Sequence, residues 1–181
     1  MLYVHPLRIK LMRSSLVFFA LTFALCLSSC SRQGRAGYAV AYKADPNNAI
    51  LVNGRAVAPR NAPLPVKDAI AAANRIQGLP YKWGGGHARL NDSGYDCSGA
   101  VSYVLRSAGL MEDQMPSRGF FFYGKRGYGK WITVYVRNGH VFLVIAGLRF
   151  DTYGRYRQDG PRWRPLPRST RGHVVRHPPG L

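Results

Sequence analysis

The sequence predicts an α+β domain, with two helices first along the chain and an antiparallel sheet after them. Three observations support this prediction: helical spacing of apolar residues between positions 63 and 108, short apolar strands after position 131, and no internal repeat. The chain has 181 residues, which leaves room for one compact domain after an export signal.

Two segments carry the helical pattern. The first helix is predicted to begin at Pro65 and to stop at Gly78, because proline suits a first helical turn and glycine a helix end. The second helix is predicted over residues 97–108, with Asp96 or Ser93 as its cap and Gly109 as its stop. One face of the first helix is apolar, formed by Val66, Ala69, Ile70, Ala73 and Ile76.

The rest of the domain reads as strands. Residues 131–136 and 140–145 flank a turn that contains Gly139, which predicts a hairpin. Residues 148–152 continue as a further strand after Ala146 and Gly147, and 173–177 form a short closing strand. Before the first helix, the turn pair Asn53-Gly54 predicts a small hairpin, with a flexible tether as the alternative for this segment.

The first 29 residues are predicted to be a signal peptide. Basic residues precede an apolar run of about 12 residues, which is shorter than the roughly 20 needed to span a bilayer. The sequence LSSC at 27–30 resembles a bacterial lipobox, so Cys30 is expected to carry lipid; the alternative is a secreted protein with an ordinary Cys30. Ser31 favours the periplasmic face of the outer membrane, and Met1 and Met12 both remain possible starts.

The chain is strongly basic, with a formal net charge of +18. Eight arginines lie between Arg149 and Arg176, against only Asp151 and Asp159. Such a surface attracts polyanions. For an exported protein these are envelope polymers and lipid headgroups, so no nucleic-acid partner is predicted; a solvated basic face is the alternative.

Three cysteines leave one thiol without a partner, since Cys26 is removed with the signal and Cys30 is lipidated. Cys97 begins the second helix, where free N–H groups and the helix dipole are expected to favour the thiolate and to bind an oxyanion. The alternative is a buried structural cysteine at the head of the apolar stripe.

A nucleophilic thiol needs a base, usually histidine. His140 is the best placed, because it opens a strand directly after a glycine turn. His87 lies in a glycine-rich loop and is expected to line the same cleft, whereas His173 and His177 read as tail or surface residues. The histidines and the thiol lack metal-ligand spacing, so neither a metal nor another cofactor is predicted.

The segments PYKWGGGHARLNDSGYDCSGAVSYVL and GHVFLVIAGLRFD, within residues 80–151, resemble the NlpC/P60 family of bacterial cell-wall cysteine peptidases. The resemblance implies a papain-like fold, with the nucleophile-bearing helix packed on an antiparallel sheet. It also implies Cys97 as the nucleophile, His140 as the base and Tyr81 as a residue near the thiol that helps to hold the oxyanion. We expect a catalytic domain over 63–181, joined to the anchor by residues 30–62.

The activity that this resemblance implies is hydrolysis of amide bonds in peptidoglycan stem peptides, usually between D-glutamate and the diamino acid. Two alternatives stay open: a non-enzymatic envelope-binding lipoprotein, and a papain-like amidase or acyltransferase that acts on another substrate. The oligomeric state is not predicted.

The chain departs from the family pattern at the third polar residue. An ungapped alignment, and the shared parity of positions 140 and 152, favour Thr152. A turn at Ala146-Gly147 frees the register, however, and a carboxylate is better suited to orient an imidazole, so Asp151 is predicted.

A second departure is the long segment 111–131, which reads either as a substrate-contacting flap or as a surface loop packed by its own rings. The candidates for substrate binding are Trp83, His87, Ser98 and Ser117.

Overall fold

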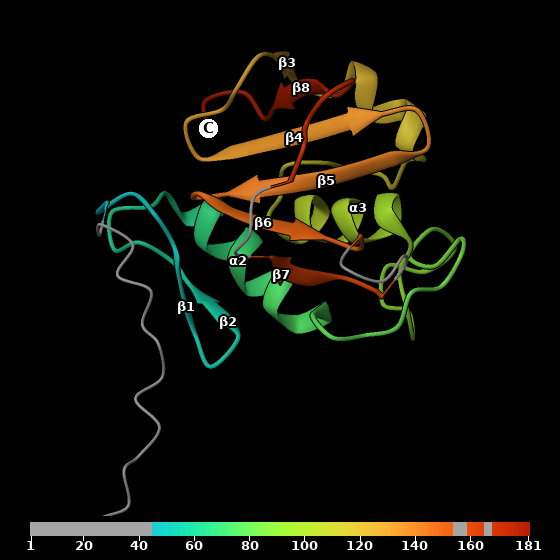
Figure 1. Ribbon diagram of the computed structural model, residues 1–181, viewed down its shortest axis with the longest axis horizontal. Coiled ribbons are helices and arrows are strands. Elements are labelled where there is room, and N and C mark those ends of the chain that lie inside the picture. The colour runs from blue at the N-terminus through green and yellow to red at the C-terminus, as the bar shows by residue number, and fades with distance from the viewer. Residues whose placement is uncertain (1–44, 154–158, 165–167) are drawn as a thin grey trace, which may run out of the picture. The chain divides into compact units, whose positions relative to one another are not determined.

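The computed structural model describes residues 45–153, 159–164 and 168–181 (Figure 1). The predicted signal peptide, the lipid site at Cys30 and the first part of the tether lie outside the described residues. Within the described part, no helix is long and apolar enough to cross a membrane.

The predicted hairpin is present before the first helix. β1 (Ile50–Val52) pairs antiparallel with β2 (Arg55–Val57), and the turn residues Asn53 and Gly54 have φ of 50° and 79°. The Asn74 side chain accepts a hydrogen bond from Ala56 N at 2.9 Å and donates one to Ala56 O at 2.8 Å. Because Asn74 of the first helix bonds to both the N–H and the C=O of Ala56 in β2, this hairpin is part of the folded unit.

Two helices form at the predicted places. α2 (Leu64–Ile76) buries the predicted apolar face and has Pro65 in its first turn. α3 (Cys97–Ser107) is capped by Asp96, whose side chain accepts from Gly99 N at 2.7 Å. The helices pack on each other and against one side of the sheet (Figure 1).

The described residues form a six-stranded sheet in the order β3-β8-β4-β5-β6-β7, and every neighbouring pair is antiparallel. The α+β prediction is confirmed, as helices pack against an antiparallel sheet. The strands are β3 (Lys125–Arg126), β4 (Ile132–Arg137), β5 (His140–Ile145), β6 (Leu148–Asp151), β7 (Arg162–Arg164) and β8 (Val174–His177).

The sequence did not predict β7, because its three residues, Arg-Trp-Arg, carry only one apolar side chain. Trp163 is buried against Phe150, with ring centroids 5.0 Å apart, and its indole N–H donates to Asn74 Oδ1 at 2.8 Å. Tertiary contacts with β6 and α2 therefore create this edge strand.

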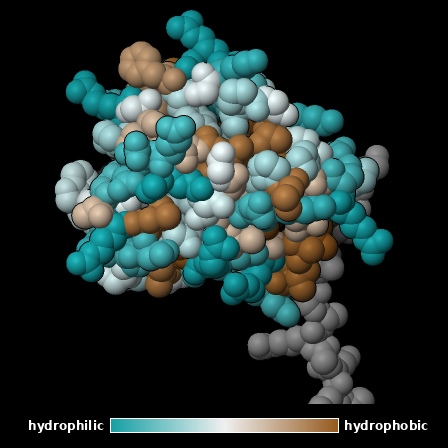
Figure 2. Space-filling model, turned by 180° about the vertical axis from the view of Figure 1, so that it is seen from behind, coloured by the Kyte–Doolittle hydropathy of each residue, from teal (hydrophilic) through white to brown (hydrophobic). Residues whose placement is uncertain are grey.

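Alternation along the strands separates two faces of the sheet. The buried residues Val134, Leu143 and Phe150 belong to the core shared with the helices. Hydrophobic residues on the outside of the molecule form separate patches between hydrophilic ones on the face that Figure 2 shows.

The segment 111–131 is neither wholly a flap nor wholly a surface loop. It contains the 3₁₀ helix η1 (Ser117–Phe122), in which Phe120 is fully buried while Phe122 is 86% exposed. The Tyr123 hydroxyl donates to Leu110 O at 2.9 Å. The core thus anchors this segment at Phe120, Tyr123 and Trp131, whereas Phe122 and Tyr128 are exposed.

Candidate active site

The glycine-rich loop lies directly against the start of α3. A side chain on Gly99 would place its Cβ 1.9 Å from Gly85 O, so the two backbones approach as closely as only glycine permits. Asp96 fastens this contact, because its second carboxylate oxygen accepts from Gly84 N at 3.1 Å while the first caps α3. The loop and the helix start therefore form one unit.

We expect Gly99→Ala to destabilise the fold by about 1–3 kcal/mol, the usual cost of overpacking. Chemical denaturation of the variant, compared with wild type, measures this loss. Gly109→Ala is the matched control beyond the other end of α3: nothing lies within 4 Å of its added Cβ, so only its φ of +67° costs free energy. A smaller loss for Gly99→Ala than for Gly109→Ala would contradict the steric explanation.

Cys97 is the first residue of α3 and is partly buried. Burial raises the pKa of the thiol; hydrogen bonds from the N–H groups of Val141 and Ser98 oppose this, while the negative charges of Asp96 and Asp151 add to it. The N–H of Ser98 at the helix start does lower this pKa, but burial outweighs it, so the expectation of an easily ionised thiol is wrong. The thiol lies beside β5, and it needs a base to take its proton.

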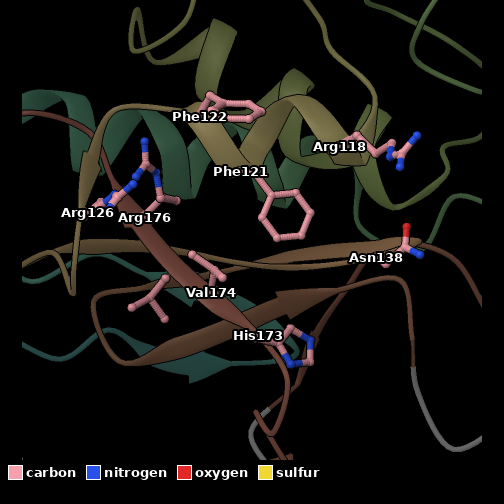
Figure 3. Close-up of a pocket in the computed structure, with 9 residues that line it drawn as sticks. Arg118, Phe121, Phe122, Arg126, Asn138, His173, Val174 and Arg176 are labelled. Carbon is pink, nitrogen blue, oxygen red and sulfur yellow. The ribbon is translucent and has the colours of Figure 1, made fainter.

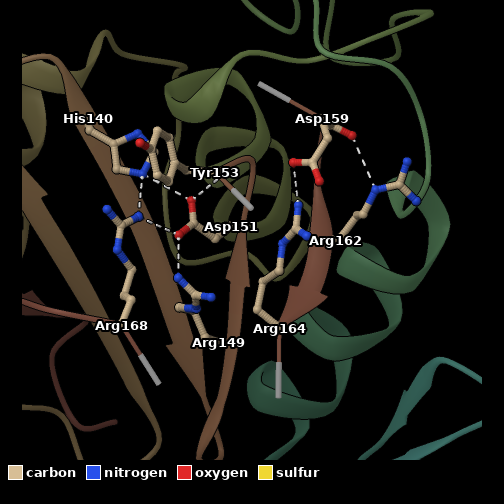
Figure 4. A network of polar contacts seen from close by, with 8 residues as sticks. All are labelled: His140, Arg149, Asp151, Tyr153, Asp159, Arg162, Arg164 and Arg168. Atoms are coloured by element: carbon tan, nitrogen blue, oxygen red, sulfur yellow. Dashed lines mark hydrogen bonds and ion pairs between the residues drawn. The ribbon is translucent and has the colours of Figure 1, made fainter. Parts of the chain in front are cut away.

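His140 and Asp151 meet on one face of the sheet. His140 Nε2 lies 3.0 Å from Asp151 Oδ1, and both side chains are almost completely buried (Figure 4). The Tyr153 N–H donates to the same carboxylate oxygen at 2.9 Å.

The turn between β5 and β6 decides which of the two candidates reaches His140. Ala146 and Gly147 have φ of 44° and 79° and make a two-residue connection, so Ile145 pairs with Leu148. Even-numbered residues of β5 therefore share a face with odd-numbered residues of β6. The parity argument for Thr152 fails for this reason, and in the described residues no hydrogen bond joins Thr152 to His140.

Two arginines hold the other oxygen of the Asp151 carboxylate. Arg149 Nη1 donates to Oδ2 at 3.1 Å and Arg168 Nη1 at 2.7 Å. Burial alone would raise the pKa of Asp151, but hydrogen bonds from His140, the Tyr153 N–H and Arg168 hold this pKa below its ordinary value. Asp151 is thus ionised in the folded protein.

The Cys97 thiol lies near the start of β5, because the backbone N–H that interacts with it belongs to Val141. His140 is the residue directly before Val141. Within the described part of the chain, no direct hydrogen bond joins Cys97 to His140. Catalytic hydrogen bonds are often long before substrate binds.

Tyr81 lies close to the same thiol. Burial raises the pKa of its hydroxyl, and the negative charges of Cys97 and Asp96 raise it further. Tyr81 is paired by a β-bridge with Tyr95, immediately before the cap of α3. The hydroxyl therefore stays protonated and can donate a hydrogen bond.

The candidates for substrate binding do not form one cluster. Trp83 is 85% exposed, beside the glycine loop. His87 Nε2 lies 3.1 Å from both Asp96 Oδ1 and Ser98 Oγ, so the side chains of His87 and Ser98 both belong to the hydrogen-bonded group around the cap of α3. Ser117 begins η1, in a different part of the surface.

An open pocket of about 940 Å³ lies between η1 and β8 (Figure 3). None of Tyr81, Cys97, His140 and Asp151 lines it. His173, read as a tail residue, lines this pocket and packs on Phe142, with ring centroids 5.4 Å apart. The other lining residues are Arg118, Phe121, Phe122, Arg126, Asn138, Val174, Val175 and Arg176.

Several arginines of the basic C-terminal region hold the fold together. Besides the pair on Asp151, Arg164 Nη2 lies 2.6 Å from Asp159 Oδ1, and Arg176 Nε donates to Tyr123 O at 2.8 Å. From the sequence, these arginines were predicted to form a basic surface. The contact between Arg168 and Asp151 joins residues 17 positions apart, so no local pattern indicates it. Among the described residues, no group of three or more His, Cys, Asp or Glu is placed to hold a metal ion.

Comparisons with known proteins add an independent observation. No family model matches the chain. The peptidoglycan endopeptidase RipB of Mycobacterium tuberculosis, found in strains CDC 1551 / Oshkosh and ATCC 25618 / H37Rv, is 32% identical over 125 residues. The match covers 55% of this chain and 52% of the relative, so the chain spans about half the length of the curated relatives it matches.

A solved structure of the peptidoglycan hydrolase RipB from Mycobacterium tuberculosis gives a TM-score of 0.48 at 22% identity, over 62% of this chain and 64% of that chain. By sequence, the chain is similar over 125 residues to a peptidoglycan endopeptidase, in agreement with the resemblance seen in its motifs.

Proposed function

We propose that this protein is a cysteine peptidase that hydrolyses amide bonds in peptidoglycan stem peptides, at the bond between D-glutamate and the diamino acid. One observation carries the proposal: Cys97 begins α3 beside β5, whose first residue, His140, is paired with Asp151 at 3.0 Å. The homology to a peptidoglycan endopeptidase supports the choice of substrate.

The first half of the reaction forms an acyl-enzyme. His140 takes the proton of the Cys97 thiol, and the sulfur attacks the amide carbonyl carbon. The negative charge passes to the carbonyl oxygen, where N–H groups at the start of α3 and the Tyr81 hydroxyl donate hydrogen bonds. His140 then gives its proton to the leaving amine, and the C–N bond breaks.

The second half releases the acid. His140 removes a proton from water, the resulting hydroxide attacks the thioester, and the proton returns to the sulfur as the C–S bond breaks. Asp151 accepts from the ring N–H throughout and stabilises the imidazolium. The buried, ionised carboxylate supports this role, because its charge is fixed before the reaction begins.

Digestion of purified peptidoglycan, followed by mass analysis of the soluble fragments, tests this function. We expect new amino termini at the diamino acid and new carboxyl termini at D-glutamate. Fragments cut elsewhere in the stem peptide would keep the enzyme class and change the bond. No release of fragments by the folded protein would overturn the proposal.

We also propose that lipid on Cys30 anchors the protein at the periplasmic face of the outer membrane. The supporting observation is the sequence LSSC after a basic and then apolar segment. We expect mass spectrometry of the mature protein to show a diacylated or triacylated Cys30 at the amino terminus, and Cys30→Ser to move the protein into the soluble fraction. An unmodified Cys30 in the mature chain would refute this anchor.

A further inference from the structure

The environment of His140 contains a cation that a simple Cys-His-Asp arrangement does not need. Arg168 Nη1 lies 3.2 Å from His140 Nε2 and 2.7 Å from Asp151 Oδ2 (Figure 4). A single guanidinium nitrogen therefore approaches both the base and the carboxylate that orients it. The segment that carries Arg168 precedes β8, far along the chain from both partners.

The guanidinium is fixed in place by more than its hydrogen bonds. Its central carbon lies 5.1 Å from the ring centre of Phe142 and 5.0 Å from that of Tyr153, distances typical of cation–π contacts. The same two aromatic rings border His140, at centroid distances of 6.1 Å and 5.9 Å. Arg168 and His140 thus share one aromatic wall.

His140 Nε2 cannot form a hydrogen bond with Asp151 and another with Arg168 at the same time. If Nε2 carries hydrogen, it donates to Asp151 and only faces Arg168; if it carries none, it accepts from Arg168 and loses the bond to Asp151. The base needs Nδ1 free for the thiol proton, so the hydrogen belongs on Nε2. In that state Arg168 is a positive charge beside an N–H, and it opposes any further positive charge on the ring.

Arg149 provides an internal comparison. It binds the same Asp151 oxygen at 3.1 Å, but no hydrogen bond or ring contact joins it to His140 among the described residues. The charged or titratable groups on the elements around His140 are Asp151 on β6, Arg168 before β8, Arg137 opposite on β4, Tyr153 after β6, and Cys97, whose helix start lies beside β5.

We infer that Arg168 is a positioning residue that keeps His140 uncharged at rest while it holds Asp151 in place. This inference rests on the proposed function in one respect, that Cys97 is the nucleophile. Without Arg168, the buried Asp151 carboxylate would favour a protonated ring, and a protonated ring would stabilise a Cys97 thiolate. With Arg168, the resting pair is a neutral thiol and a neutral imidazole, and the proton moves when substrate is present.

The observed burial of Cys97 agrees with this resting state, since burial raises the pKa of the thiol. Removing the charge of Arg168 affects the imidazolium more than the thiolate, because Arg168 lies against the ring. The net effect of Arg168→Gln is therefore a more stable thiolate–imidazolium pair, and the thiolate forms at lower pH.

The test is the rate of Cys97 alkylation by iodoacetamide as a function of pH, followed by mass mapping of the peptide that contains Cys97. At pH 6 we expect Arg168→Gln to react about three- to tenfold faster than wild type, with the same plateau at high pH. Arg168→Lys keeps the charge and should stay near wild type. Arg149→Gln, the matched control, should change the rate less than about twofold.

Three results would overturn the inference. The alkylation rate could be unchanged in Arg168→Gln, it could change equally in Arg168→Gln and Arg149→Gln, or it could rise as much in Arg168→Lys as in Arg168→Gln. If Arg168→Gln does not fold, ring nitrogen NMR of the wild-type protein decides. A neutral His140 with hydrogen on Nε2 at pH 7 supports the inference, and a charged ring refutes it. None of these measurements uses peptidoglycan, so their outcome is separate from that of the proposed function.

Discussion

Cys97→Ala should abolish the release of peptide fragments from peptidoglycan. The variant removes the sulfur that attacks the carbonyl carbon in the proposed reaction. In a serine protease, loss of the nucleophile lowered turnover by a factor on the order of 10⁶. We expect a loss of similar size here, below the limit of a fragment assay.

The measurement is mass analysis of a peptidoglycan digest, made alongside circular dichroism of the same sample. Alanine in place of a partly buried thiol keeps the helix start intact, so the fold is retained. Cys97→Ser is the useful second variant, because it preserves size and polarity but supplies a poorer nucleophile. Full activity in either folded variant would exclude a cysteine peptidase.

Asp151→Asn should lower turnover by about 10²- to 10³-fold, whereas Thr152→Ala should lower it only slightly. Loss of the orienting carboxylate cost about 10⁴-fold in a serine protease triad. A smaller loss is expected here because a thiol is more acidic than a serine hydroxyl and so depends less on the base and on the carboxylate that orients it.

Asparagine is preferable to alanine at this position. Asp151→Ala would leave Arg149, Arg168 and His140 around an empty buried site, so part of any loss would be a loss of stability. The thermal midpoint of each variant is therefore measured together with its kinetics on one peptide substrate. A crippled Thr152→Ala with a nearly active Asp151→Asn would reverse the assignment.

Some predictions depended only on local sequence, and these agree with the structure. Helix α2 keeps its apolar face and its Gly78 stop, and α3 begins at Cys97 with Asp96 as its cap. The Asn53-Gly54 hairpin also forms. Periodicity, caps and turn pairs are properties of neighbouring residues, so they can be read without knowledge of the tertiary contacts.

Other features could not be predicted from the sequence, because they depend on contacts between residues that are far apart along the chain. β7 forms because Trp163 packs on Phe150 and bonds to Asn74, which is 89 residues away. The expectation of an easily ionised Cys97 was wrong because it considered the helix start alone, whereas burial against β5 raises the pKa of the thiol.

The sequence by itself determined the helix that presents Cys97, the strand that presents His140 and the family to which their motifs point. Only the tertiary structure decided which residues contact the His140 ring. The two-residue turn at Ala146-Gly147 sets the register that brings Asp151 to the ring, and a distant segment brings Arg168 to the same carboxylate. Buried charges interact according to their distance in space, and the number of residues between them along the chain does not predict that distance.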